Sequence, residues 1–564
     1  MGSLIAAAVG LALGLSGAAA GHATSLLADP EEPGANRPAA GQSLFDELFA
    51  LPPLATRGNG ARYALPFPFE RLLAELNARL APAEATGVLI PLGRSLQRHA
   101  ADPDYFASPR TVVAVTDDAG APGRPLLKDR LYLGYHERAE VIEVISYNEA
   151  AGRFEFQVVE DYGPDREPRV RHGERFVCIA CHQGHGPIFA TAVWNETNAD
   201  PRVAARLAAL GTTFHGVATR GGVDRADAID RSTDRAARIA FANALWTEGC
   251  GPPDEPDAIR CRGDLLLDAL RYRLGGARAA PDVAPGSPSA ALAERLAGRL
   301  PRLAPAGLGA PSPDLPNRDP LAEIAAGVAP DAAIEPEGVF EPTLERAPVV
   351  FWRPSTPVGE LLATAVGDIA ATFADADIVW LDDRLAALEP EPPGLAQARL
   401  ACRTWSLEAG PGRRELRLAC DAGSTQPRAV LEGHVILADD VPNAGMIGRL
   451  ALDGHAPLSR LVVAGGSYRR EANTETLQLR LRESGLGLRA RLAGGERLAP
   501  LQLRIGPDGE AALELRALDD LASLRAALAG MVEAAVADPG AALSAGPLRR
   551  RAVLDELAAA LEPR

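Results

Sequence analysis

A change in composition divides this 564-residue chain into two halves with different folding patterns. Residues 276–338 are rich in Ala, Pro and Gly, which is typical of a linker, and one short helix is expected near Ala290–Leu300. Residues 63–275 mix strand and helix patterns and predict an α+β domain. Residues 339–510 contain short strand-like segments separated by turn sequences, which predict an antiparallel β-rich domain, and residues 511–564 predict terminal helices. We therefore expect the α+β fold class.

The N-terminus has the features of an export signal. Residues 1–23 include a small, apolar run from Leu4 to Ala20, as in a secretory signal peptide, although no Lys or Arg precedes the run. An uncleaved anchor is the alternative, but the run is short for a membrane span. Residues 24–62 are polar and predict an irregular arm. Since no later segment is long and apolar enough to cross a bilayer, we expect a periplasmic or secreted protein without a stable membrane span after cleavage.

The charge balance limits the kind of partner that the chain can bind. Lys and Arg total 58 and Asp and Glu total 74, which gives a formal net charge of −16. This balance argues against generic nucleic-acid binding, because phosphate contacts require clustered cations. An acidic surface instead favours a basic partner protein, since electrostatic steering accelerates their encounter.

Four of the six cysteines fit two disulfides in an oxidising compartment. Cys402 and Cys420 flank a segment whose midpoint contains Pro411. If this segment is a hairpin that turns at Pro411, the two cysteines lie directly opposite each other and can reach disulfide geometry. Cys250 and Cys261 bracket a Pro-rich loop and can close it as a second crosslink. The alternative is four buried free thiols.

The other two cysteines belong to the densest functional signal in the chain. Cys178, Cys181 and His182 form the pattern C-x-x-C-H, which is the attachment signature of c-type haem. On a helical turn, positions i, i+3 and i+4 share one face. The two thiols can then bond to the two vinyl groups of a haem, while the imidazole binds the iron from below as the proximal ligand.

Two other kinds of site use the same residue types. Cys178 and Cys181 can form a plain disulfide or a thioredoxin-like redox pair, but no βαβ pattern follows them. A zinc site would use Cys178, Cys181 and His185, with His182 or His172 as the fourth ligand. Paired cysteines elsewhere in an exported chain make zinc the weaker alternative.

The sequence CIACH, in its exported context, resembles the c-type cytochromes. The resemblance rests on this motif and does not extend to the small all-helical cytochrome domain, because here the motif follows a predicted β-hairpin. It implies one covalent haem c per chain, bound at Cys178, Cys181 and His182, and electron transfer by its iron. Residues 130–200 are also similar to a group of bacterial exported proteins that carry one such motif.

The sixth ligand of the iron has several candidates. His215 and His172 rank first by their distance along the chain from the proximal histidine, followed by His136 and Met446. A five-coordinate iron is the remaining alternative. Each of these histidines can equally be an ordinary surface or hydrogen-bonded residue.

Other residues near the motif can contact a haem. Arg169, Arg171 and Arg175 suit haem propionates, because guanidinium groups pair well with carboxylates, or they belong to a solvated loop. Trp194 can pack on the haem edge, or it precedes a helix in which Asp200 is the N-cap and the next residue, a proline, opens the first turn.

Three functions follow from these features. The first is single-haem electron transfer with a redox partner protein. The second is a haem enzyme, a peroxidase or another oxidoreductase, which needs an open iron position and a distal acid/base pair. The third is a haem sensor or scaffold protein in which the C-terminal β-rich half carries the function.

Overall fold

The computed structural model describes part of the chain, with only the backbone given for the strands between 396 and 518. The described residues are 38–51, 62–93, 98–118, 120–182, 184–189, 196–274, 281, 283, 285, 287–305, 307–310, 321, 349–388, 396–408, 413–421, 429–438, 441–452, 458–471, 474–483, 497–498, 501–505, 510–515, 517–518, 522–544 and 546–562. The expected export signal, residues 1–23, lies outside them.

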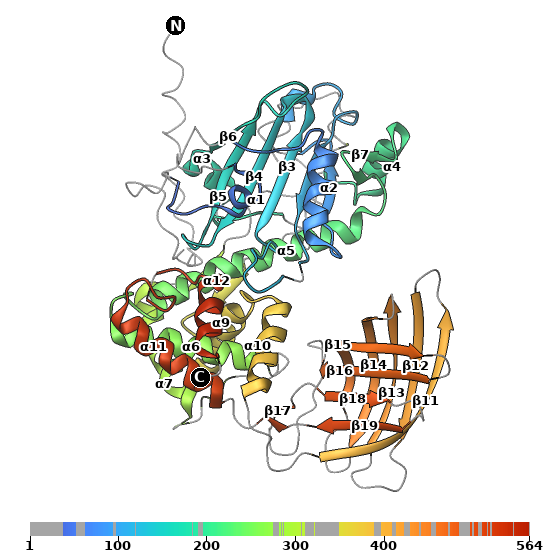
Figure 1. Cartoon of the computed structure of the whole chain (residues 1–564). Coiled ribbons are helices and arrows are strands. Elements are labelled where there is room, and N and C mark those ends of the chain that lie inside the picture. The colour runs from blue at the N-terminus through green and yellow to red at the C-terminus, as the bar shows by residue number, and fades with distance from the viewer. Residues whose placement is uncertain are drawn as a thin grey trace.

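A six-stranded antiparallel sheet organises the first half of the chain (Figure 1). Each strand pairs with its neighbour in sequence, so the order is β1 to β6 without a crossover. The strands are β1 (Thr86–Ile90), β2 (Arg110–Ala114), β3 (Leu131–His136), β4 (Val141–Asn148), β5 (Arg153–Glu160) and β6 (Arg169–His172). The expected hairpin around residues 148–152 is confirmed as β4 and β5.

One face of this sheet, which we call the inner face, carries helices α1 (Leu44–Phe49) and α2 (Phe69–Leu80). Helix α5 (Gly222–Ala244) lies on the other face, where it hydrogen-bonds Tyr132 and Tyr147, and all three helices share one apolar cluster with the sheet. In α2, leucines at helical spacing form one buried stripe. Residues 24–62 were expected to form an irregular arm, but helix α1 lies within them. Ser43 and Asp46 form a capping box that starts this helix.

Helices that follow the sheet begin as the sequence indicates. Asp200 accepts a hydrogen bond from the backbone N–H of Arg202 and caps α4 (Pro201–Leu210), as expected. A short antiparallel pair, β7 (Thr213–Phe214) and β8 (Val217–Ala218), separates α4 from α5. The long α5 continues into a π-helical turn, η4 (Leu245–Gly249).

A second core is helical and is built from both halves of the chain. Its helices are α6 (Pro256–Leu274), α7 (Pro288–Leu303), α9 (Val358–Ala370), α10 (Asp375–Leu388), α11 (Ala522–Ala537) and α12 (Arg550–Ala560). The predicted disulfide between Cys250 and Cys261 is present and joins the end of η4 to α6. A two-stranded pair, β9 (Leu308–Ala310) and β10 (Val349–Trp352), contributes apolar side chains to this core.

Two expected boundaries differ from this arrangement. Residues 276–338 were expected to be a linker with a short helix, but α7 within them buries Leu292, Leu296 and Leu300 in the helical core. The i, i+4 spacing of these leucines explains the packing. The region expected to be β-rich, residues 339–510, also contains α9 and α10, which lie before its first barrel strand.

The chain between α10 and α11 forms a closed antiparallel barrel. Its strands are β11 (Ala396–Glu408), β12 (Arg413–Asp421), β13 (Ala429–Ala438), β14 (Val441–Leu452), β15 (Leu458–Glu471), β16 (Thr474–Glu483), β18 (Leu501–Ile505) and β19 (Glu510–Leu515), and β19 pairs with β11. A further pair joins β17 (Arg497–Leu498) to β20 (Ala517–Leu518). The register of β11 and β12 places Cys402 opposite Cys420, as the hairpin prediction requires, and their disulfide stays a prediction.

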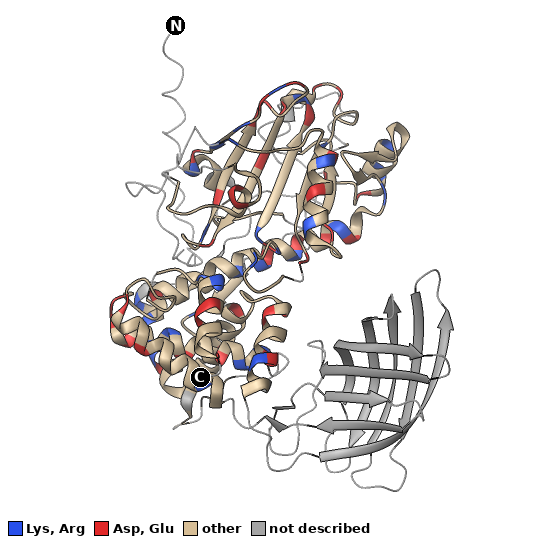
Figure 2. Ribbon diagram, in the orientation of Figure 1, with Lys and Arg blue, Asp and Glu red and all other residues tan. Residues whose placement is uncertain are grey.

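The fold class is α+β, as expected. In Figure 2, acidic and basic residues are interspersed over the described ribbons of the sheet and the helical core. Among the described helices, none combines the length and the apolar composition that a bilayer span requires.

Candidate functional site

The motif residues lie on a short helix that follows the last strand of the sheet. Helix α3 (Arg175–Cys181) starts three residues after β6, and the backbone N–H of His182 donates to the carbonyl of Cys178 at 2.9 Å. Cys178, Cys181 and His182 therefore occupy positions i, i+3 and i+4 of one helical turn. This helical backbone is consistent with the prediction that the three residues share one face.

The imidazole of His182 is held in one orientation. Its Nδ1 lies 2.8 Å from the carbonyl oxygen of Gly186, which can only accept, so Nδ1 carries the proton and Nε2 is left with a free lone pair. The ring also packs against Phe156 of β5, with 5.5 Å between centroids. Burial lowers the pKa of His182, an effect to which Arg110 adds, while the Gly186 carbonyl and Glu143 oppose it. The imidazole is thus neutral at neutral pH, as a metal ligand must be.

The thiol of Cys178 is free and half-buried. A side chain at Gly173 would come within 3.3 Å of its sulfur, so the glycine at the end of β6 makes room for it. Burial raises the pKa of this thiol, and Glu143 adds to the effect. Because the thiol of Cys178 is free, the structure does not support the interpretation of the motif as a plain disulfide.

An ion pair crosses the sheet on the same side as α3. Arg110 of β2 reaches Glu143 of β4 over the intervening strand, with 2.5 Å between nitrogen and oxygen. Gly134 of β3 allows this, because a Cβ at that position would overlap the guanidinium of Arg110. We did not anticipate this pair from the sequence. The available signal was the isolated glycine in the strand LYLGYH, which often marks a close approach of another group.

The two first-ranked candidates for a sixth ligand lie on the inner face of the sheet. His172 is opposite Gln157 in the β5–β6 register, and the Gln157 amide donates to Asp46 of α1. The ring of His215 packs against Tyr135 at 4.8 Å, and Tyr135 in turn stacks on α2. The structure therefore does not bring His172 or His215 to the face on which α3 lies.

His136 lies on the face that carries α3. It follows Tyr135 in β3, so its side chain points to the opposite side from Tyr135, toward Arg110. It is 3% exposed, and its Nδ1 has no hydrogen-bond partner among the described residues. Burial lowers the pKa of His136 to about 4, with Arg110 contributing, so this imidazole is also neutral. Met446 lies in β14 of the barrel, for which the structure describes only the backbone.

The three arginines near the motif differ in their partners. Arg169 and Arg171 form ion pairs with Asp161 and Glu160, respectively, and are largely exposed. Arg175 is buried, donates to the carbonyl of Phe154 and lies 5.3 Å from the ring centroid of Phe156. Burial lowers the pKa of Arg175 to about 10. Trp194 lies outside the described residues.

The zinc alternative finds no support in the described part of the site. No group of three or more His, Cys, Asp or Glu side chains with the arrangement of metal ligands occurs there. His185 lies on the turn after the motif, where its backbone N–H donates to the carbonyl of His182 at 2.7 Å.

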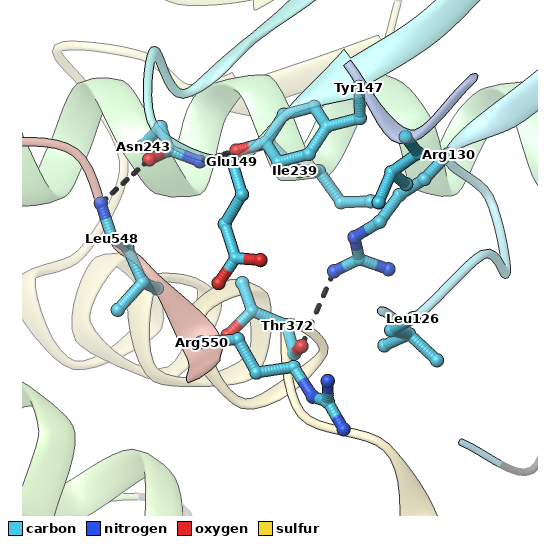
Figure 3. A pocket seen from close by; sticks show the side chains of 10 residues that line it. Leu126, Arg130, Tyr147, Glu149, Ile239, Asn243, Thr372, Leu548 and Arg550 are labelled. Atoms are coloured by element: carbon cyan, nitrogen blue, oxygen red, sulfur yellow. Dashed lines mark hydrogen bonds between the residues drawn. The ribbon is translucent and has the colours of Figure 1, made fainter. Parts of the chain in front are cut away.

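A pocket of about 350 Å³, counted with its part open to solvent, lies where the sheet meets the helical core (Figure 3). Its buried Arg130 donates to the carbonyls of Lys128 and Thr372 and stacks near Tyr147. Burial lowers the pKa of Arg130, and the neighbouring Arg550 adds to the effect. The partners of Arg130 are thus backbone carbonyls of the sheet region and of the helical core. This pocket therefore belongs to the junction between the sheet and the helical core and not to the motif.

No family model, curated protein or solved structure matches this chain.

Proposed function

We propose that this chain binds one haem c covalently at Cys178, Cys181 and His182 and acts as an exported electron-transfer protein. The observation that carries the proposal is the hydrogen bond between His182 Nδ1 and the Gly186 carbonyl. Iron-ligating histidines are commonly oriented in this way by a second group, which leaves Nε2 directed to the metal. The free Cys178, one turn earlier on the same helix, supplies a thiol at the spacing that the attachment requires.

The surface of α3 fits an apolar cofactor. Phe176 and Val177, directly before the first cysteine, are 51% and 43% exposed. Large apolar side chains at such exposure are unusual when they adjoin one another, and they often mark a surface that something covers. A covalently held haem is an apolar group of the right kind at this place.

The residues of the chain have distinct roles in this proposal. Each cysteine thiol would add across one vinyl group, with sulfur bonding to one carbon and the proton to the other. His182 would ligate the iron through Nε2, and Gly186 would keep its ring from rotating. When bound, the haem supplies a reversible one-electron Fe(III)/Fe(II) couple.

The partner and the compartment are part of the same proposal. The net charge of −16 favours a basic redox partner, since opposite charges steer the encounter. The Cys250–Cys261 disulfide supports a periplasmic or secreted location, because such bonds persist in oxidising compartments.

Expression together with a c-type haem maturation system tests the proposal. We expect one haem per chain that stays attached after denaturation, and we expect Cys178→Ala or Cys181→Ala to weaken the attachment. His182→Ala should change the absorption spectrum of the iron. His185→Ala is the matched control, because this histidine is three residues away on the same turn and should leave the spectrum unchanged. A wild-type chain without covalent haem would contradict the proposal.

A haem enzyme or sensor with an open iron position is the second candidate. It is favoured by the location of His172 and His215 on the inner face, away from His182. Spectra with carbon monoxide separate the two functions. A low-spin ferrous iron whose spectrum does not change with CO favours electron transfer. A high-spin iron that binds CO favours catalysis or sensing.

A further inference from the structure

The pocket at the junction of the sheet and the helical core contains a buried arginine that is bonded to neutral groups. The guanidinium of Arg130, a residue that is 6% exposed, donates to the carbonyls of Lys128 and Thr372 at 2.8 and 3.3 Å. These two bonds supply no negative charge, and the guanidinium carries more N–H groups than they use. A buried charge is normally paired with an opposite one, because the loss of its hydration is costly.

The two carboxylates that act on Arg130 electrostatically are each paired with another arginine. Asp129 pairs with Arg235 at 2.7 Å. Glu149, which lines the pocket, accepts from the backbone N–H of Arg551 on one oxygen and from the guanidinium of Arg551 on the other. The positive charge of Arg130 is therefore only partly compensated by the protein itself.

The hydroxyl of Tyr147 is a second donor in the wall of the pocket. The backbone N–H of Leu548 donates to Oδ1 of Asn243, so Nδ2 of the same amide donates to the Tyr147 hydroxyl. This hydroxyl accepts that bond and keeps its own proton for another acceptor. Burial raises the pKa of Tyr147, so the proton is present at neutral pH.

The surroundings of these donors favour a charged ligand of small size. In Figure 3, the guanidinium of Arg130 and the carboxylate of Glu149 both point toward the middle of the pocket. Apolar side chains form much of the remaining wall, namely those of Leu44, Leu126, Ile239 and Leu548. Charges attract each other more strongly in such apolar surroundings than in water. The planar fork of a guanidinium matches the oxygens of a carboxylate or a phosphate.

We propose that this pocket binds a small oxyanion, a carboxylate or a phosphate, through Arg130 and Tyr147. Its volume of about 350 Å³, which includes the part open to solvent, lies at the lower end of the range for small-molecule sites. Arg130 also bonds the carbonyl of Thr372, which lies between α9 and α10. The bound ion therefore stabilises the contact between the sheet and the helical core, independently of any haem at the motif.

Thermal unfolding of the full chain, titrated separately with phosphate and with acetate, tests this inference. We expect a saturable rise in Tm of the wild type, and the ion with the lower midpoint concentration identifies the class of ligand. Arg130→Gln should weaken the affinity about tenfold or more, because a charge-assisted hydrogen bond is lost. Glu149→Gln should strengthen it, since this change removes a negative charge from the wall. Arg231→Gln, at an exposed position of α5, is the matched control and should leave the affinity unchanged.

The anion dependence separates a binding role of Arg130 from a purely structural one. General salt effects act on all variants alike. A structural role alone predicts that Arg130→Gln lowers Tm by the same amount at every anion concentration. That result, or the absence of a saturable rise in the wild type, would overturn the inference. If Arg130→Gln does not fold, the Glu149→Gln variant decides: tighter binding supports the site, whereas unchanged or weaker binding contradicts it.

Discussion

Single residues in this chain have consequences well beyond their own positions. The two imidazoles on the side of the sheet that carries α3, His136 and His182, are both held neutral by burial. C-x-x-C-H could be identified without a structure because its spacing is local, within one helical turn. The Arg110–Glu143 pair could not, because these residues are far apart in sequence and meet only through the strand register. The face of His172 depends on the same register, and the position of His215 depends on the packing of its ring against Tyr135.

Gly222 is a position where a single methyl group should be costly. A Cβ there would overlap the backbone of Asn198 and Ala199, which cannot move as a flexible side chain can. We expect Gly222→Ala to destabilise the protein by about 1–3 kcal/mol, the usual cost of overpacking. Gly298→Ala in α7 is the control, since nothing lies within 4 Å of its Cβ, and it should stabilise by about 0.5–1 kcal/mol. Urea unfolding measures both, and equal effects would contradict the expectation.

Asp368 in α9 should make stability depend on pH. Burial raises the pKa of this carboxyl to about 7, because the attraction of the partly exposed Arg238, 3.0 Å away, only partly compensates for the lost hydration. The folded chain then binds the proton more tightly than the unfolded chain. The stability that this group contributes is full below pH ~4 and is lost as the pH rises to about 7.

Replacement of this carboxyl tests the effect. The stability gained by Asp368→Asn should be small near pH 4, grow up to about pH 7 and then stay constant, reaching on the order of 1–4 kcal/mol. Asp257→Asn on the exposed side of α6 is the control and should change stability little at any pH. Denaturation at pH 4.5 and pH 8 makes the comparison. A gain that falls with rising pH would refute the assignment.

At the scale of elements, structures set by local sequence patterns could be predicted, whereas placements set by tertiary contacts could not. The β4–β5 hairpin, the cap of α4 and the register of Cys402 with Cys420 follow from turn and capping signals within a few residues. The placement of α7 in the helical core does not, because composition alone does not reveal which helix its leucines will contact. A segment rich in Ala, Pro and Gly can thus contribute a buried helix to a core.

The Cys250–Cys261 disulfide closes the loop between η4 and α6, and both residues are buried. Because it constrains the unfolded chain, we expect Cys250→Ala/Cys261→Ala to lower the free energy of unfolding by about 2–4 kcal/mol. The midpoint of helix loss in urea, followed by circular dichroism, measures this. Cys402→Ala/Cys420→Ala serves as a control at the barrel and should leave the helical transition in place. An unchanged midpoint in the first variant would show that the crosslink is dispensable.

At the scale of the whole molecule, the last helix, α12, contacts both the helical core and the N-terminal sheet region. The guanidinium of Arg550, in the first turn of α12, forms two hydrogen bonds with Asp377 of α10 and also donates to the carbonyls of Ala121 and Arg124 beside the sheet. The next residue, Arg551, pairs with Glu47 of α1. These contacts join the last helix, the helical core and the N-terminal sheet, although the barrel separates α10 from α11 in sequence.

Arg550 should therefore be more important for stability than its partly exposed neighbour Arg551. Asp377 is 0% exposed, so Arg550→Met would leave a buried carboxylate unpaired, at a cost of about 3–5 kcal/mol. Replacing both partners, as in Arg550→Met/Asp377→Leu, should recover much of this loss, since no charge then remains to be solvated. Arg551→Met, whose ion pairs are partly exposed, should cost only about 1 kcal/mol. Hydrogen exchange of α12 and of residues 121–127 should rise together in Arg550→Met, because one side chain holds both segments. Faster exchange confined to α12 would mean that the sheet is held to the helical core by other contacts.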